Sequence, residues 1–202
     1  MFSVKQDAIP ADLVELGRIV SAYGVRGWVK IQPHSMQTKA LLNAKTWWLK
    51  TPRPESQAGV FASASPRQIQ TAKQHGATIV AQFEGLDNRE VAQALKGHTV
   101  WVSRAAFPPA DDDEFYWVDL IGCRFFGEQE GLAHLLGQVA EVLDNGAHSI
   151  LVVHRGCWDA NGVFAPEKDE QGRPLEELVP FVQAIVHTVD LPARELHSHW
   201  AI

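Results

Sequence analysis

The residues of this chain that could act as nucleophiles or general bases are few and scattered. The chain has 2 cysteines and 9 histidines, and none of them falls in the spacing of a known catalytic pair or of a C-x-x-C metal pair. Cys123 follows an apolar run and Cys157 lies in a polar segment. No disulfide framework is therefore expected, and both thiols are predicted to be reduced. The sequence predicts a protein that is not an enzyme.

Two groups of residues have the chemistry to hold a cation. His197 and His199 alternate along a predicted strand and would share one face of it, but a zinc site needs three or four ligands and no third ligand stands near them. Four consecutive acids at residues 111–114 follow a proline pair, which is typical of a solvated linker. We expect solvent-facing histidines, no metal and no cofactor.

Charge divides the chain into two halves of opposite sign. Residues 1–104 hold 13 Lys and Arg against 7 Asp and Glu, a balance of +6, while residues 105–202 hold 5 against 17, a balance of −12. Residues 16–53 contain seven basic residues and no acidic one. Such a segment is compatible with nearby phosphate, although a solvated basic surface is the more common reason for it. The acidic half should repel RNA and attract basic proteins.

Short segments in which apolar and polar residues alternate, separated by turn residues, are the elements that position these charges. Residues 13–23 and 28–32 predict two strands around a glycine-rich turn at 24–27, and Asn145-Gly146 between two apolar runs is a strong hairpin signal. One helix is expected, with Asp87 as its N-cap and Glu90 as the capping-box partner. Further strands are predicted at residues 46–50, 67–71, 78–83, 100–102, 121–126, 137–143, 150–154, 178–181, 184–191 and 195–200. The predicted fold class is all-β, with a small barrel or sandwich in each half.

A proline-rich and acidic stretch in the middle of the chain predicts a domain boundary. Three adjacent aromatic residues follow it: Phe115, Tyr116 and Trp117. We predict a first domain at residues 1–105, a short linker at 106–113 and a second domain at 114–202. If the aromatic segment is extended, neighbouring side chains face opposite ways. At least one ring is then expected at a surface or a domain seam.

Neither a secretory signal nor a membrane span is predicted. Residues 1–10 lack the apolar core of a signal peptide, and no window approaches the roughly 18 apolar residues that a span needs. Residues 156–173 are polar and glycine-containing, and a mobile excursion is expected there. The sequence predicts a soluble, cytoplasmic protein.

Several motifs, taken together and in this order, resemble the bacterial ribosome maturation factor RimM family. In the first half they are residues 16–30 and 88–102; in the second half they are residues 114–123, 143–148, 150–153, 178–181 and 189–191. The first set is similar to the opening motif, the helix and the last strand of the family's first domain. The second set is similar to its PRC-barrel domain. The resemblance spans most of residues 14–191.

The resemblance implies two small β-barrels, an N-terminal one like those of translation factors and a C-terminal PRC barrel. It also implies an accessory, chaperone-like factor that binds the head of the immature 30S ribosomal subunit through ribosomal protein S19 and promotes 16S rRNA processing. The family binds through an aromatic pair at the start of its second domain, commonly Tyr-Tyr, which Phe115 and Tyr116 match. With Trp117 and Asp119 they form the predicted site for the ribosomal protein. A monomer is expected.

A direct rRNA-binding module built on the basic first half is the alternative. The residues expected near rRNA are Arg18, Tyr23, Arg26 and Lys30. Trp28, Trp47 and Trp48 are the candidate stacking surfaces. Steep salt dependence of binding to naked rRNA would identify this module. A small-ligand barrel would need convergent polar groups in a pocket, which the sequence does not display.

Overall fold

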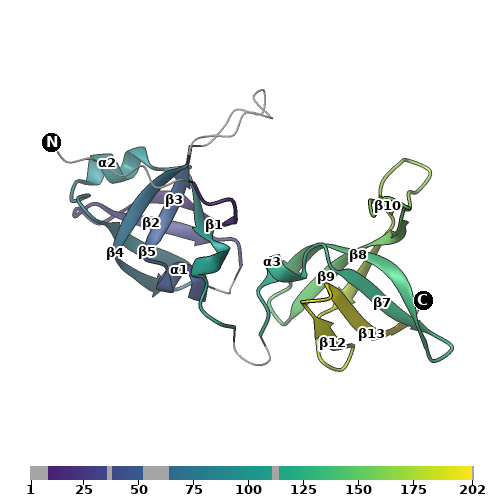
Figure 1. Cartoon of the computed structure of the whole chain (residues 1–202). Helices are drawn as coiled ribbons and strands as arrows, with labels where there is room; N and C mark the ends of the chain where they lie inside the picture. The colour runs from purple at the N-terminus through teal and green to yellow at the C-terminus, as the bar shows by residue number, and fades with distance from the viewer. Residues whose placement is uncertain (1–8, 36–37, 52–63, 111–113, 202) are drawn as a thin grey trace. The chain divides into compact units, whose positions relative to one another are not determined.

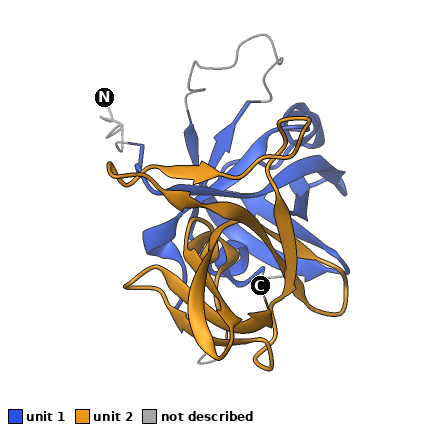
Figure 2. Ribbon diagram, turned by 90° about the vertical axis from the view of Figure 1, so that its right-hand side faces the viewer, with its two compact units in different colours: residues 1–109 blue, residues 110–202 orange. Residues whose placement is uncertain are grey.

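The chain forms two compact units, residues 1–109 and residues 110–202, which Figure 2 shows in different colours. The structure is a computed structural model that describes residues 9–35, 38–51, 64–110 and 114–201. Most of the acidic run, residues 111–113, lies outside the described residues. Among those that are described, no helix combines the length and the apolar character needed to cross a membrane.

The first unit is a closed barrel with the strand order β1-β2-β5-β4-β3-β6 (Figure 1). Its strands are β1 (Leu13–Tyr23), β2 (Trp28–Pro33), β3 (Thr46–Lys50), β4 (Ser65–His75), β5 (Thr78–Phe83) and β6 (Thr99–Ser103). The last strand, β6, pairs antiparallel with both β1 and β3 and so closes the ring. Each of these six described strands therefore has a hydrogen-bonded neighbour on both sides, so the ring that they form has no free edge.

Alternation along β2 explains which side of the barrel wall each residue occupies. Val29 and Ile31 are 0% exposed, whereas Lys30 between them is partly exposed. Because side chains on a strand point alternately to its two faces, the apolar residues fill the barrel and the lysine lies outside. The predicted hairpin of β1 and β2 is confirmed by their pairing, which brings Tyr23 opposite Trp28.

Trp47 on β3 is the largest fully buried side chain of the barrel, at 0% exposed. Its ring meets Phe83 edge to face with the ring centroids 5.8 Å apart. Its indole Nε1 donates a hydrogen bond of 3.2 Å to the carbonyl oxygen of Leu41. Leu41 lies in α1 (Lys39–Asn43), a short helix that the sequence pattern did not predict. The buried indole thus finds the partner that its N–H group needs.

The predicted helix is α2 (Arg89–Ala94), but its cap is one residue later than expected. Asn88, not Asp87, is the N-cap, and its side-chain Oδ1 accepts from the backbone N–H of Glu90 at 2.7 Å. Asn88 has the extended backbone that an N-cap residue adopts. Ala92 is the helix residue that is fully buried, at 0% exposed, whereas Val91 is 52% exposed.

The second unit is a seven-stranded sheet with the strand order β10-β9-β8-β7-β13-β12, in which β11 also pairs with β9. Its strands are β7 (Arg124–Gln129), β8 (Leu132–Asp144), β9 (Ser149–Trp158), β10 (Phe164–Pro166), β11 (Glu176–Pro180), β12 (Val186–Asp190) and β13 (Glu195–Ala201). The pairing of β13 with β7 is parallel, and the other pairings are antiparallel. The predicted all-β class is confirmed, with mostly strands in both units.

The two ends of this sheet are joined by a short piece of chain. Among the described residues β11 and β12 do not pair with each other, and residues 181–185 lead from one to the other. Backbone hydrogen bonds hold that crossing at both ends. The N–H of Phe181 donates to the Ser149 carbonyl at 2.8 Å, and the N–H of Val186 donates to the Val182 carbonyl at 2.8 Å. The sheet thus wraps around its core and leaves a gap between two strand edges.

The core of the second unit consists of side chains from all around this sheet. Its fully buried members include Leu120, Phe125, Leu151, Val153 and Leu196, each 0% exposed. The hairpin predicted from Asn145-Gly146 is confirmed by the pairing of β8 with β9.

Residues 156–173, where a mobile excursion is expected, contain strands and turns. There β9 continues to Trp158 and pairs with β10, and two aspartates organise the turns. The Oδ1 atom of Asp159 accepts from the N–H groups of Asn161 and Val163 at 2.8 and 2.9 Å. Asp169 does the same for Gln171 and Arg173, at 2.9 Å each. A polar composition here reflects turn chemistry rather than a lack of structure.

Candidate functional site

The two cysteines do not form a reactive centre. Cys123 is 0% exposed, and its Sγ–H donates to the Asp119 carbonyl oxygen at 3.2 Å. Burial raises the pKa of the Cys123 thiol above its usual value of 9.0, so it stays protonated and unreactive near neutral pH. Cys157 is exposed and lies on β9.

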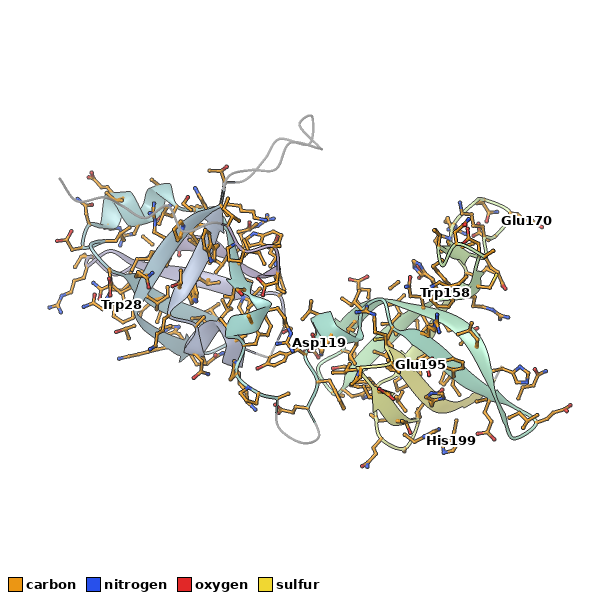
Figure 3. The ribbon with its side chains drawn as sticks, in the orientation of Figure 1. Trp28, Asp119, Trp158, Glu170, Glu195 and His199 are labelled. Carbon is orange, nitrogen blue, oxygen red and sulfur yellow. The ribbon has the colours of Figure 1, made fainter. Side chains whose placement is uncertain are left out.

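His197 and His199, both on β13, contact different residues. The ring of His197 stacks on Phe126 at 4.6 Å between centroids. His199 is labelled in Figure 3. Its Nδ1 atom lies 2.8 Å from Glu128 Oε2, and its ring lies 4.5 Å from that of His187. Within the parts of the chain that the structure describes, no three His, Cys, Asp or Glu residues are arranged to hold a metal ion.

The aromatic segment at the start of the second unit turns into a helix. Phe115 and Tyr116 precede α3 (Trp117–Leu120), a single helical turn, so the extended conformation considered for the whole segment is wrong from Trp117 onward. Hydrogen bonds from Asp119 N–H to the Tyr116 carbonyl at 2.9 Å and from Ile121 N–H to the Trp117 carbonyl at 3.1 Å hold the turn.

Helical periodicity places these side chains differently from strand alternation. Phe115 and Trp117 are partly buried and pack against the core of the second unit, and Leu120 enters that core at 0% exposed. Tyr116, the N-cap of α3, is 7% exposed. Of the four predicted site residues, Phe115 lines a pocket, while Asp119 lies within α3, partly exposed.

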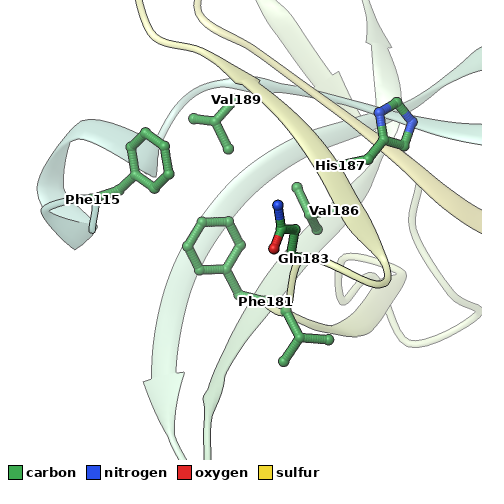
Figure 4. Close-up of a pocket in the computed structure, with 7 residues that line it drawn as sticks. Phe115, Phe181, Gln183, Val186, His187 and Val189 are labelled. Carbon is green, nitrogen blue, oxygen red and sulfur yellow. The ribbon is translucent and has the colours of Figure 1, made fainter. Parts of the chain in front are cut away.

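That pocket has a volume of about 200 Å³ and opens where β11 and β12 leave the gap. Its lining includes Phe115, Phe181, Gln183, Val186, His187 and Val189. The rings of Phe115 and Phe181 meet at 6.0 Å between centroids with an angle of 66° between their planes. Figure 4 shows these two rings together, with His187 at the far end from Phe115. We call this the gap pocket.

The sequence analysis missed every member of the gap pocket except Phe115. Two of the missed residues belong to motifs that carried the family resemblance, since Phe181 closes residues 178–181 and Val189 opens residues 189–191. Those motifs were a usable signal. Their meeting with Phe115 could not be deduced, because it depends on the chain crossing between two strands that do not pair.

The four residues expected near rRNA all lie on the β1–β2 hairpin. In the register of the two strands, Arg18 lies opposite Gln32, Ser21 opposite Lys30 and Tyr23 opposite Trp28. The buried residues that alternate with these pairs point into the barrel. Arg18, Lys30 and Tyr23 therefore share the outer face. Arg26 lies in the exposed turn at its tip.

The hairpin turn is held in a defined shape by its glycines and by two side chains. Gly27 has φ of 73°, and a Cβ there would lie 2.3 Å from the Leu86 carbonyl oxygen, so only glycine fits. Arg89 of α2 donates from Nη1 to the Gly24 carbonyl at 2.8 Å. Gln82 of β5 donates from Nε2 to the Arg26 carbonyl at 3.2 Å. These contacts orient the tip that carries Arg26.

Two of the three candidate stacking residues cannot stack on a ligand. Trp47 and Trp48 are 0% and 5% exposed, so their expected role as stacking surfaces is wrong. Trp28 is partly exposed on the outer face of β2 (Figure 3).

Comparisons with known proteins agree along nearly the whole chain. The family model described as RimM N-terminal domain matches residues 14–107, and the one described as RimM PRC barrel domain matches residues 117–201. A ribosome maturation factor RimM from Bordetella parapertussis is 52% identical, over 96% of this chain and 95% of its own length. One from Cupriavidus pinatubonensis is 42% identical, over 97% of this chain and 84% of its own length. A RimM crystal structure from Pseudomonas aeruginosa is 28% identical, with a TM-score of 0.41 over 94% of this chain and 98% of that one.

Proposed function

Because this chain belongs to the ribosome maturation factor RimM family, we propose that it is an accessory assembly factor for the small ribosomal subunit. It binds the head of the immature 30S subunit through ribosomal protein S19 and promotes 16S rRNA processing, as a cytoplasmic monomer and without catalysis. The observation that carries this proposal is the match of both family domains, in order, over residues 14–107 and 117–201.

The gap pocket is the proposed contact for the ribosomal protein. It offers two aromatic rings, Phe115 and Phe181, at an opening in the sheet, and large aromatic side chains in partly enclosed pockets are frequent anchors of protein interfaces. Glu114 and Asp190, both exposed, adjoin its lining residues in the sequence. Tyr116 and Trp117, which follow Phe115 in the sequence, and Asp119 of α3 complete the proposed contact.

Charge supports a basic protein as the partner of the second unit. That unit carries a balance of −12, against +6 for the first. Opposite charge accelerates diffusional encounter and suppresses wrong partners. The same charge opposes approach of the second unit to a polyanion, so we assign the protein contact to the second unit and proximity to rRNA to the first.

The proposal is tested by the affinity of the full chain for purified S19. Phe115→Ala should weaken binding by more than about 1 kcal/mol, the level at which an interface truncation is notable. Phe126→Ala is the matched control, since it removes a partly buried ring of the same unit outside the gap pocket. Equal losses for the two variants would argue against the gap pocket as the contact.

A second experiment addresses the role in assembly rather than the contact. Tagged protein from a cell lysate should sediment with immature small subunits and not with mature ribosomes. Co-sedimentation with mature ribosomes alone would overturn the proposed function.

Direct rRNA binding by the first unit is the second candidate function, and the outer face of the β1–β2 hairpin favours it. Changing Arg18, Arg26 and Lys30 to Gln should then lower affinity for protein-free rRNA and reduce its salt dependence, by roughly one unit of slope per lost phosphate contact. Tight binding to protein-free rRNA at physiological salt, together with no affinity for S19, would make this the primary function.

A further inference from the structure

A second and larger pocket lies on the outside of the first barrel. It has a volume of about 430 Å³, within the roughly 300–1,000 Å³ of pockets that hold small ligands. It is lined by the turn after β1, by Trp28 of β2, by the last residues of β4 and by Val80 of β5. In the register, β2 pairs with β5 through Val80, and Val80 pairs with Lys73 of β4, so these three strands are neighbours in the barrel wall. We call it the hairpin pocket.

Aromatic rings form one part of the hairpin pocket. Tyr23 is 39% exposed and meets the His75 ring edge to face at 5.3 Å between centroids. Its hydroxyl lies 3.5 Å from His75 Nε2. Trp28, opposite Tyr23 in the register, also lines the pocket. The buried side chain of Val80 adds an apolar contribution. A flat apolar group therefore finds matching surfaces here.

Positive charge forms the other part. Arg26 from the first turn and Lys73 from β4 line the pocket, and Lys73 Nζ lies 6.0 Å from the centre of the Trp28 ring. Lys30 follows on the same outer face of β2. None of the described residues that line the pocket is an Asp or a Glu. The ligand that matches this lining is flat on one side and anionic on the other.

We propose that the hairpin pocket binds one unpaired nucleotide of RNA, with its base against Tyr23 and Trp28 and its phosphate near Arg26 and Lys73. This inference rests on the proposed function and names the kind of RNA element that the first unit recognises. A base within a duplex has both faces covered by its neighbours, so only a single-stranded or bulged nucleotide can offer a face to these rings. The pocket thus selects for rRNA that has not yet paired.

The test measures fluorescence anisotropy of a labelled single-stranded RNA hexamer, and of a duplex of the same sequence, with the full chain. Tyr23→Ala should weaken hexamer binding at least about fivefold, the lower end of what stacking on one base contributes. Tyr23→Phe keeps the ring and should stay within about twofold of the unsubstituted protein. Duplex binding should not respond to Tyr23→Ala. Thermal unfolding of each variant verifies that the barrel is intact.

Charge substitutions separate a pocket from a diffuse basic surface. Lys73→Gln and Arg26→Gln should each lower the salt slope of hexamer binding by roughly 0.7 unit, the value for one lost contact on a single strand. Lys45→Gln is the matched control, because Lys45 is exposed and lies outside the pocket. Arg26 lies in the exposed turn, so its variant reports on binding even if another variant unfolds.

Three results would overturn the inference. They are no detectable hexamer binding by the unsubstituted protein, unchanged binding by Tyr23→Ala, and an equal loss for Lys45→Gln and Lys73→Gln. Co-sedimentation with immature subunits is measured in parallel. If it persists while the hexamer results fail, the nucleotide site is wrong and the assembly role stands; if the unsubstituted protein does not sediment with immature subunits, the assembly role itself is wrong.

Discussion

In the first unit β6 pairs on both sides and completes a ring; in the second, β11 and β12 each pair with one neighbour, and residues 181–185 span the distance between them. The consequence is visible in where each unit carries a pocket. The closed barrel keeps its interior full, and its pocket lies outside, beside the β1–β2 turn and the last residues of β4. The sheet with a gap has its pocket at that gap, beside aromatic residues that pack on its core.

This contrast links closure of the sheet to the kind of partner that each unit can bind. Because buried side chains fill the interior of the first barrel, we expect its binding surfaces on the outside, on exposed strands and turns. In the second unit, the residues of the proposed contact, such as Phe115 and Phe181, also pack against the core. Stability and binding should therefore be separable in the first unit and coupled in the second.

The largest effect is expected for Trp47→Ala in the closed barrel. Removing this fully buried ring leaves a cavity and removes the indole hydrogen bond to the Leu41 carbonyl, at a cost of about 3–5 kcal/mol in the free energy of unfolding. Urea denaturation monitored by circular dichroism measures the cost. Trp158→Ala in the second unit is the control, because Trp158 is partly exposed and should cost less. A loss below about 1 kcal/mol for Trp47→Ala would contradict the tight packing of the ring.

Phe181→Ala tests whether stability and binding are coupled at the gap. Because Phe181 is only partly buried, we expect a loss of roughly 1–2 kcal/mol in the free energy of unfolding, less than for a fully buried ring. Affinity for S19 should fall in the same variant, as measured by titration calorimetry. A variant with lower stability and unchanged affinity would show that the two properties are independent at this site.

Phe115→Tyr adds one hydroxyl group to the gap pocket and tests whether binding can change while stability does not. The family resemblance implies Tyr at this position, and a hydroxyl that finds a partner at the interface contributes about 1 kcal/mol. Affinity for S19 should therefore rise by up to about fivefold, with little change in the melting temperature. Weaker binding by this variant would show that the gap pocket has no room for the hydroxyl.

Acid should destabilise both units by a small amount, through three carboxylates. Hydrogen bonds from backbone N–H groups lower the pKa of Asp12, Asp159 and Asp169 below 3.8. Their stabilising contribution is therefore fully present above the unfolded-state pKa of about 3.9 and is lost as the pH falls through the lower folded-state pKa values.

The test of this pH dependence compares melting temperatures at neutral pH and below pH 3. Asp12→Asn should be less stable than the unsubstituted protein at neutral pH, and the difference should shrink in acid. The exposed Glu84 provides the control Glu84→Gln, which should show no such trend. If the difference in melting temperature between Asp12→Asn and the unsubstituted protein does not change with pH, the loss arises from altered hydrogen-bond geometry rather than from the charge of Asp12.

Much of the fold was predictable because short-range patterns determine it. The alternation of Val29, Lys30 and Ile31 identified β2, and the Asn145-Gly146 pair identified the β8–β9 hairpin. The helix α3 was not predictable in this way, because a four-residue turn of helix has too few residues for a periodic pattern. The helix α1 is equally short.

The candidate sites were only partly predictable. Arg26 and Tyr23 stood out because charge and aromatic character are visible in the sequence, and the structure brings both to one pocket. Trp47 and Trp48 were wrong as stacking surfaces, because exposure depends on which neighbours cover a strand residue; Trp48, for example, lies opposite Trp101 and Pro66. Phe181 joins Phe115 only through a long-range crossing of the chain.

The gap between β11 and β12 also has a consequence for self-association. Strand edges with unpaired backbone groups are templates on which a second molecule can add a strand, and proteins protect them with charge and proline. Here β11 carries Glu176, Glu177 and Pro180, and β12 ends at Asp190. Like charges on two molecules repel when such edges approach. The acidic character of this unit thus keeps its open sheet from extending into the β-aggregates that a neutral edge would nucleate.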